Sequence, residues 1–113
     1  MARGRAESKR TESGAAERMA VLADPMRRMI FEMLAEGPRS VSDIAESLPV
    51  TRPAVSQHLR ALSDAGFVTY SSIGTRNLYC VEPARIAEVR DYLDQLWRRA
   101  LVNLKKRAEK PHN

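Results

Sequence analysis

The sequence predicts a mainly α-helical fold with about five helices and one two-stranded β-hairpin, arranged as a winged helix-turn-helix. Three observations favour this fold class. Residues 40–65 have the pattern of two short amphipathic helices joined by a tight turn. Alternating polar and apolar residues then predict a hairpin. The last third of the chain has the apolar spacing of one long helix.

The net charge of the chain is concentrated at its two ends. Among 113 residues the formal net charge is +5. Residues 1–13 carry +2 without apolar periodicity, which predicts a disordered basic N-terminal tail. Residues 105–113 carry +3 and are expected to form a basic C-terminal tail. The domain expected in residues 14–104 has no net charge, so composition alone is weak evidence for a nucleic-acid partner.

The sequence pattern favours a cytoplasmic protein with no membrane contact. No apolar run has the length of a transmembrane helix, and the N-terminus is polar and charged, unlike a signal peptide. Cys80 is the single cysteine of the chain. It excludes an internal disulfide and fits a reducing compartment.

Two helices are expected before the helix-turn-helix. The first, in residues 14–22, offers Met19 and Leu22 as apolar contacts. Asp24 and Pro25 are expected to begin the second helix, because Asp caps a helix N-terminus and Pro fits the first turn. The apolar stripe of this second helix is expected to face the core. It comprises Met26, Met29, Ile30, Met33 and Leu34.

The helix-turn-helix itself is marked by its two N-terminal caps. Ser40 and Asp43 have the spacing of a capping box, although Asp replaces the usual Glu or Gln. Thr51 is expected to cap the second helix, which runs to about residue 65. The buried face of this second helix is predicted from the spacing of Val55, Leu59 and Leu62.

The other face of that second helix is polar and rich in hydrogen-bond donors. It carries Arg52, Ser56, Gln57, Arg60 and Ser63. Such a face suits base edges in a major groove, where Arg can bind guanine and Gln adenine with two bonds each. A solvated helix face is the alternative. Residues 50–81 carry a local charge of +2 and residues 82–97 a local −2, which favours the nucleic-acid interpretation.

A hairpin directly after such a helix is typical of a wing. Strands are expected in residues 67–72 and 77–81, with the tip at residues 73–75. Arg76 would stand beside the tip, within reach of backbone phosphates or a minor groove. A surface Arg on a loop is the alternative.

The last helix is expected from about residue 83 to about residue 106. Its heptad-spaced stripe comprises Ile86, Val89, Leu93, Leu96 and Ala100, and Trp97 lies beside it. This helix is too apolar on too many sides to be covered by so small a body. A dimer contact made together with the first helix, through Met19 and Leu22, is therefore expected. A helix folded back on its own core is the alternative.

Three segments together resemble the ArsR family of bacterial winged-helix repressors. They are LADPMRRMIFEMLAEG, SVSDIAESLPVTRPAVSQHLRALSDAGFV and GTRNLYCVEP. The resemblance covers residues 19–104 and implies a symmetric homodimer that binds double-stranded DNA at a palindromic operator. It also implies repression that a signal relieves; the sequence does not identify the inducer.

The resemblance also implies roles for individual residues in DNA binding. By position in the motif, Arg52, Ser56 and Gln57 would read bases. Ser42, Thr51 and Arg60 would lie near the backbone, and Arg76 on the wing. His58 stands where the family commonly has His, and either a phosphate contact or packing at the core edge is open. These eight positions form the predicted DNA-binding set.

The sequence departs from the metal-sensing members of this family. Residues 40–43 contain no thiol where those members place a cysteine pair, and no His stands near Asp91 and Asp94 in the last helix. Tight transition-metal binding needs three or four nitrogen or sulfur ligands. Neither a metal site nor a cofactor is therefore expected, and the chain resembles the metal-free members, which are often autorepressors.

The main alternatives to a DNA-binding repressor are a winged-helix protein-interaction module and a thiol-responsive regulator acting through Cys80. The first would need an apolar exposed face on residues 52–65, and that face is polar. Cys80 is flanked by Tyr79 and Val81 on a predicted strand, which favours a small buried filler over a redox sensor. Enzymatic activity is not expected, since no nucleophile-base pairing, phosphate loop or paired carboxylates occur.

Overall fold

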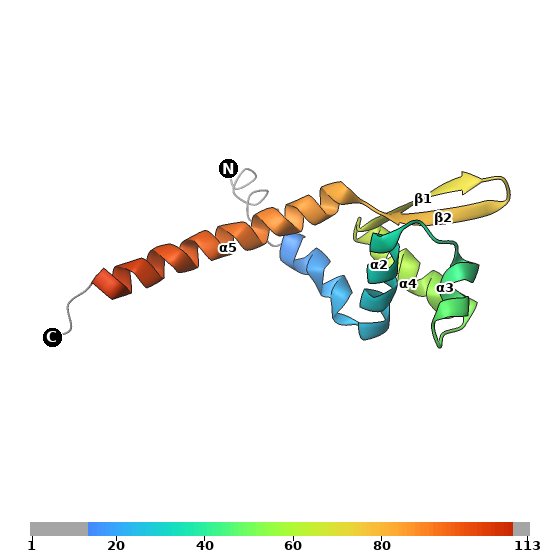
Figure 1. Cartoon of the computed structure of the whole chain (residues 1–113), viewed down its shortest axis with the longest axis horizontal. Coiled ribbons are helices and arrows are strands. Elements are labelled where there is room, and N and C mark those ends of the chain that lie inside the picture. The colour runs from blue at the N-terminus through green and yellow to red at the C-terminus, as the bar shows by residue number, and fades with distance from the viewer. Residues whose placement is uncertain (1–13, 110–113) are drawn as a thin grey trace, which may run out of the picture.

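The computed structural model of the chain describes residues 14–109, and it confirms the predicted fold class. Residues 14–19 are helical and lead into a short 3-10 helix. The elements that follow are η1 (Ala20–Ala23), α2 (Pro25–Glu36), α3 (Val41–Ser47), α4 (Arg52–Asp64), β1 (Val68–Ile73), β2 (Arg76–Val81) and α5 (Pro83–Glu109). Helices α2, α3 and α4 cluster at one end of the molecule, the hairpin extends past them, and α5 leaves in the opposite direction (Figure 1).

The core lies between α2, α3, α4 and the base of the hairpin. It consists of Ile30, Leu34, Ile44, Val55, Leu59, Leu62, Phe67 and Val68. The predicted stripe of α4 is fully buried, and full burial of one such side chain contributes about 1.5–3 kcal/mol. The ring of Phe67 meets that of Phe31 edge to face at 5.5 Å, which ties α2 to the start of the hairpin.

The predicted N-terminal caps of α2 and α3 are confirmed. The carboxylate of Asp24 accepts from the backbone N–H of Arg27 at 3.0 Å at the start of α2. Ser40 and Asp43 form the reciprocal capping box of α3, with bonds of 3.1 and 3.2 Å. These bonds pair amides that a helix leaves unsatisfied at its first turn.

One prediction for α2 is wrong, because Met29 is 46% exposed and does not lie in the core. Successive residues in a helix are about 100° apart, so Met29 and Phe31 flank the buried Ile30 on opposite sides. The ring of Phe67 packs on Phe31, whereas Met29 stays exposed. Spacing alone therefore placed the stripe of α2 too far toward Met29.

The hairpin is an antiparallel pair with its register running from Val68 opposite Val81 to Ile73 opposite Arg76. Both Ile73 and Arg76 belong to the strands, so the turn is shorter than expected and Gly74 takes it with φ +64°. The backbone of Arg39, between α2 and α3, pairs with that of Tyr79 through bonds of 3.0 and 2.8 Å. The wing is thus fixed to the helix-turn-helix along its second strand.

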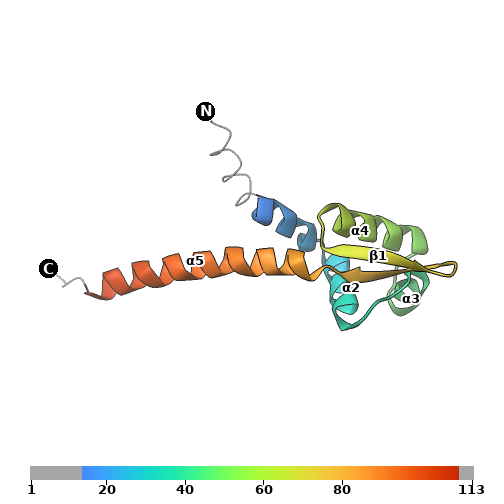
Figure 2. The same ribbon diagram turned by 90° about the horizontal axis from the view of Figure 1, so that it is seen from above.

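Helix α5 projects away from the body, as both views show (Figures 1 and 2). None of its residues is buried, and it continues to Glu109, so residues 105–109 are helical where a tail was expected. Residues 1–13 and 110–113, where the outer parts of the predicted tails fall, lie outside the described residues. In the described part of the chain, no helix is long and apolar enough to span a membrane.

Candidate nucleic-acid interface

Helix α4 presents one polar face to solvent. Its opposite face is buried through Val55, Leu59 and Leu62, which determines how the helix is rotated. The predicted base-reading positions, Arg52, Ser56 and Gln57, are all exposed, and so is Arg60, which was predicted to lie near the DNA backbone. In Figure 2 α4 lies along the outer side of the body. The structure thus brings four predicted positions onto one accessible helix surface.

Two further predicted positions lie at the starts of helices. The hydroxyl of Thr51 caps α4 by accepting from the backbone N–H of Ala54 at 3.3 Å, and its side chain remains exposed. Ser42 is half-buried in the first turn of α3. Helix N-termini expose backbone N–H groups and a partial positive charge, which favours phosphate.

Arg76 reaches from the wing to the start of α3. Its Nη2 donates to the hydroxyl of Ser40 at 2.9 Å and to the carboxylate of Asp43 at 3.1 Å. The Arg76 side chain keeps an exposure of 59%. The sequence did not predict this contact. Complementary charge between Arg76 and Asp43 was the available signal, but 33 residues separate them.

The environment of Asp43 favours its charged form. The backbone N–H and then the hydroxyl of Ser40 lower the pKa of this carboxyl below its ordinary value, and the guanidinium of Arg76 lowers it further. The same carboxylate therefore caps α3 and holds Arg76 at neutral pH.

His58 lies on α4 at the edge of the core. It is half-buried, and its Nδ1 is enclosed without a hydrogen-bond partner among the described residues. The backbone N–H of Arg27 is the main cause of the lowered pKa of Asp24, and the charge of nearby His58 contributes. This placement favours packing over a direct phosphate contact for His58.

The predicted dimer residues divide into two groups. Leu22 and Val89 are half-buried against the core of their own chain, and Met19 is also half-buried. The others are exposed: Ile86, Leu93, Leu96, Trp97 and Ala100. Folding back on the core is thus limited to the first turns of α5, and Trp97 stays 60% exposed.

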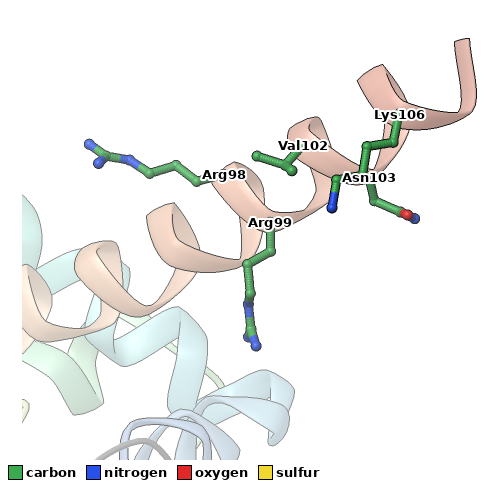
Figure 3. A pocket seen from close by; sticks show the side chains of 5 residues that line it. All are labelled: Arg98, Arg99, Val102, Asn103 and Lys106. Carbon is green, nitrogen blue, oxygen red and sulfur yellow. The ribbon is translucent and has the colours of Figure 1, made fainter. Parts of the chain in front are cut away.

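The later turns of α5 carry a basic surface depression (Figure 3). Arg98, Arg99, Val102, Asn103 and Lys106 line it. All five come from the one helix and are exposed. Helical spacing places Arg98 and Val102 on the side of α5 opposite to Leu93 and Leu104. The depression is thus an open helix face that adjoins the apolar stripe at Asn103, seven residues on from Leu96.

Cys80 is half-buried, which corrects the expectation of a buried filler. Its Sγ lies 3.4 Å from the hydroxyl of Thr69 across the hairpin, on the exposed side of β1. Strand alternation points this side chain away from the core that Tyr79 and Val81 contact. Within residues 14–109, no three His, Cys, Asp or Glu side chains are grouped so that they could hold a metal ion.

Comparisons with known proteins agree with this architecture. Residues 24–70 match the family model described as bacterial regulatory protein, arsR family. The HTH-type transcriptional regulator Rv2034 of Mycobacterium tuberculosis is 50% identical over 81 residues, covering 72% of this chain and 76% of that protein.

Two solved structures resemble the whole domain. An ArsR-like transcriptional regulator from Rhodococcus sp. RHA1 has a TM-score of 0.74 at 30% identity, covering 88% of this chain and 96% of that one. A homodimeric winged helix-turn-helix DNA-binding domain, Mb0332 from Mycobacterium bovis, has a TM-score of 0.60 at 28% identity, covering 89% and 85%. The chain therefore belongs to the ArsR family of bacterial regulatory proteins.

Proposed function

We propose that this protein is a homodimeric, sequence-specific repressor of transcription that binds an inverted-repeat operator. The observation that carries the proposal is the exposed polar face of α4, held on a helix-turn-helix by a fully buried opposite face. Membership of the family supports a role in transcription. The homodimeric state of the M. bovis neighbour supports the dimer.

On DNA, α4 would lie in the major groove with its N-terminal half toward the bases. Arg52, Ser56 and Gln57 supply the donors and acceptors that base edges require. Thr51 and Ser42 stand at helix starts, where backbone N–H groups bind phosphate, and Arg60 extends along the same exposed face. His58 would help to hold α4 in place by packing at the edge of the core.

Arg76 would act mainly by fixing the wing. In the free protein its guanidinium bonds to Ser40 and Asp43, so the wing is already held against α3 before DNA arrives. Its exposed remainder leaves donors free for a phosphate. A wing fixed in this way loses little conformational entropy on binding.

The dimer would form through the stripe of α5 that the body leaves in solvent. Ile86, Leu93, Leu96 and Leu104 are each between 38% and 62% exposed. Pairing two copies would cover these side chains and Trp97, and full burial of one leucine contributes about 1.5–3 kcal/mol. A two-fold axis would then place the two α4 helices about 34–36 Å apart, one turn of DNA.

The same observations speak against a protein-interaction module on this face. A partner protein that packed against α4 would need an apolar surface on this helix, because helix recognition between proteins relies on apolar contacts. The exposed positions of α4 carry polar or charged side chains, apart from Pro53 in the first turn. This composition fits a solvated polyanion better than an apolar groove.

The salt dependence of binding tests the proposal. Two copies each of Arg60 and Arg76 would neutralise about four phosphates, and the two positive charges of Arg52 in the groove would raise the counterions released to about six. The logarithm of the affinity should then fall with the logarithm of salt concentration with a slope between about −3.6 and −5.4. Titration of labelled DNA at several salt concentrations measures it, and a slope near zero would exclude the DNA interface.

A further inference from the structure

Helix α5 is held to the body by very few contacts, all near its start. No residue of α5 is buried. The backbone N–H of Glu82, just before α5, donates to the carbonyl of Phe67 at 2.8 Å, and Val89 packs on the edge of the core. Tyr92 is still half-buried, and from Leu93 onward every residue of α5 is exposed as the helix projects from the body (Figure 1). The direction of α5 is therefore decided within its first three turns.

Arg85, in the first turn of α5, lies directly against the end of α4. Gly66 follows α4 with φ +82°, and a Cβ built on it would stand 2.5 Å from both Nε and Nη2 of Arg85. The guanidinium thus occupies the space that any side chain at Gly66 would need. The N–H of Gly66 donates to the carbonyl of Ser63 in the last turn of α4. A cation at a helix C-terminus is favoured by the helix dipole.

Glu88 holds the guanidinium of Arg85 in that position. Its Oε2 accepts from Nη1 of Arg85 and, at 3.1 Å, from Nη1 of Arg18 in the first helix. The side chain of Arg85 is 23% exposed, whereas that of Glu88 is 51% exposed. The carboxylate of Glu88 therefore ties the first helix to the start of α5, and Arg85 in turn lies against the end of α4.

We propose that Arg85 is a positioning residue that sets the angle between α4 and α5, and through it the half-site spacing that the dimer accepts. This inference rests on the proposed function. A helix of 27 residues is about 40 Å long, so tilting α5 by about 10° would shift α4 by about 3–4 Å relative to a dimer axis halfway along it. That shift is close to the rise of one base pair, about 3.4 Å.

The two ion pairs that Glu88 makes with Arg85 and Arg18 affect the angle between α4 and α5 more than they affect the stability of the fold. Ion pairs at this degree of exposure add little to the free energy of unfolding. Arg85→Ala is therefore expected to fold and to dimerise through α5. Its effect should appear in which DNA geometry the dimer prefers.

The test measures affinity for operators that differ only in the spacer between half-sites. The operator is first recovered by selecting fragments of the source genome that the purified protein retains. Wild type should bind the natural spacer at least about tenfold tighter than spacers one base pair shorter or longer, since each step turns one half-site by about 34°. For Arg85→Ala the ratio should fall below about threefold, because a looser dimer tolerates more than one spacing.

Two further variants separate positioning from a general loss of structure. Arg98→Ala removes an exposed arginine of the same helix, bonded only to Asp94 within α5, and should keep the wild-type ratio. Gly66→Ala forces the guanidinium away and also strains the backbone at φ +82°, so its stability is measured first; the folded variant should flatten the ratio as Arg85→Ala does. In the double variant Gly66→Ala with Arg85→Ala, the spacer ratio should fall no further than in Arg85→Ala alone, because both changes remove the same contact between Arg85 and the end of α4.

The possible results distinguish this inference from the proposed function. If Arg85→Ala folds, dimerises and keeps the wild-type spacer ratio, the role of Arg85 is refuted while the repressor proposal stands. If wild type retains no genomic fragment, the proposed function itself fails and this inference falls with it. If wild type retains an operator but binds all spacers equally, the spacing role is refuted while the repressor proposal stands. If Arg85→Ala does not fold, Glu88→Gln replaces it, and an unchanged ratio in that variant overturns the inference.

Discussion

Replacing both Leu93 and Leu96 with aspartate is expected to give a monomer that binds the operator no better than random DNA. Both leucines lie on the exposed stripe of α5, with exposures of 47% and 38%. In a dimer, four carboxylates would enter an apolar contact without partners, at a cost of at least several kcal/mol. Because specific binding exceeds non-specific binding by about 10³-fold or more, losing the second half-site should remove most of the operator affinity.

Solution mass and operator affinity, measured on the same samples, check this prediction. Val102→Asp is the matched control, since it places an aspartate on the same helix but on the side turned away from Leu93. It should remain dimeric and keep its affinity. A folded monomeric Leu93→Asp, Leu96→Asp variant with full operator affinity would refute the role of α5.

Gln57→Ala should weaken binding to the operator by about 1–3 kcal/mol and change binding to random DNA little. The reason is that Gln57 is exposed on the reading face of α4 and is suited to bind an adenine edge, which carries sequence information. A phosphate contact would weaken both kinds of DNA alike. Competition of labelled operator against random DNA measures the ratio directly.

Arg76→Ala provides the comparison for that ratio. It removes a donor near the backbone and loosens the wing from Ser40 and Asp43, so it should weaken operator and random DNA about equally. If instead Gln57→Ala leaves the operator-to-random ratio unchanged, the assignment of the reading face on α4 is wrong.

Local features of this fold could be predicted from the sequence because they depend on residues three or four apart. The caps at Asp24, Ser40 and Thr51 each pair a side chain with an amide three residues on. The buried stripe of α4 follows from the helical period alone. The class of the fold then follows from the order of these elements.

Features that depend on the packing of distant segments could not be predicted. Met29 was placed in the core because spacing does not reveal that Phe67 packs on Phe31 while Met29 stays exposed. The bond from Arg76 to Asp43 and the position of Arg85 over Gly66 join segments far apart in the chain. The composition of α5 indicated apolar surface that the body of the chain would leave uncovered. It did not indicate that Val89 would pack on the core while Trp97 stays in solvent.

The candidate DNA face divides in the same way. Arg52, Ser56, Gln57 and Arg60 could be placed because one helix carries them all and its buried face is evident. The role of His58 could not be predicted, since a phosphate contact and packing at the core edge differ only in what surrounds the side chain. Its enclosed Nδ1 depends on how α4 packs at the core edge near Asp24.

Selection of bound fragments from the source genome tests the central claim most directly. A two-fold dimer that reads DNA through α4 should enrich fragments carrying one inverted repeat, with half-site centres about 10–10.5 base pairs apart. Two chains should occupy each such site. Enrichment of single or directly repeated sites, or no enrichment over random fragments, would contradict the account.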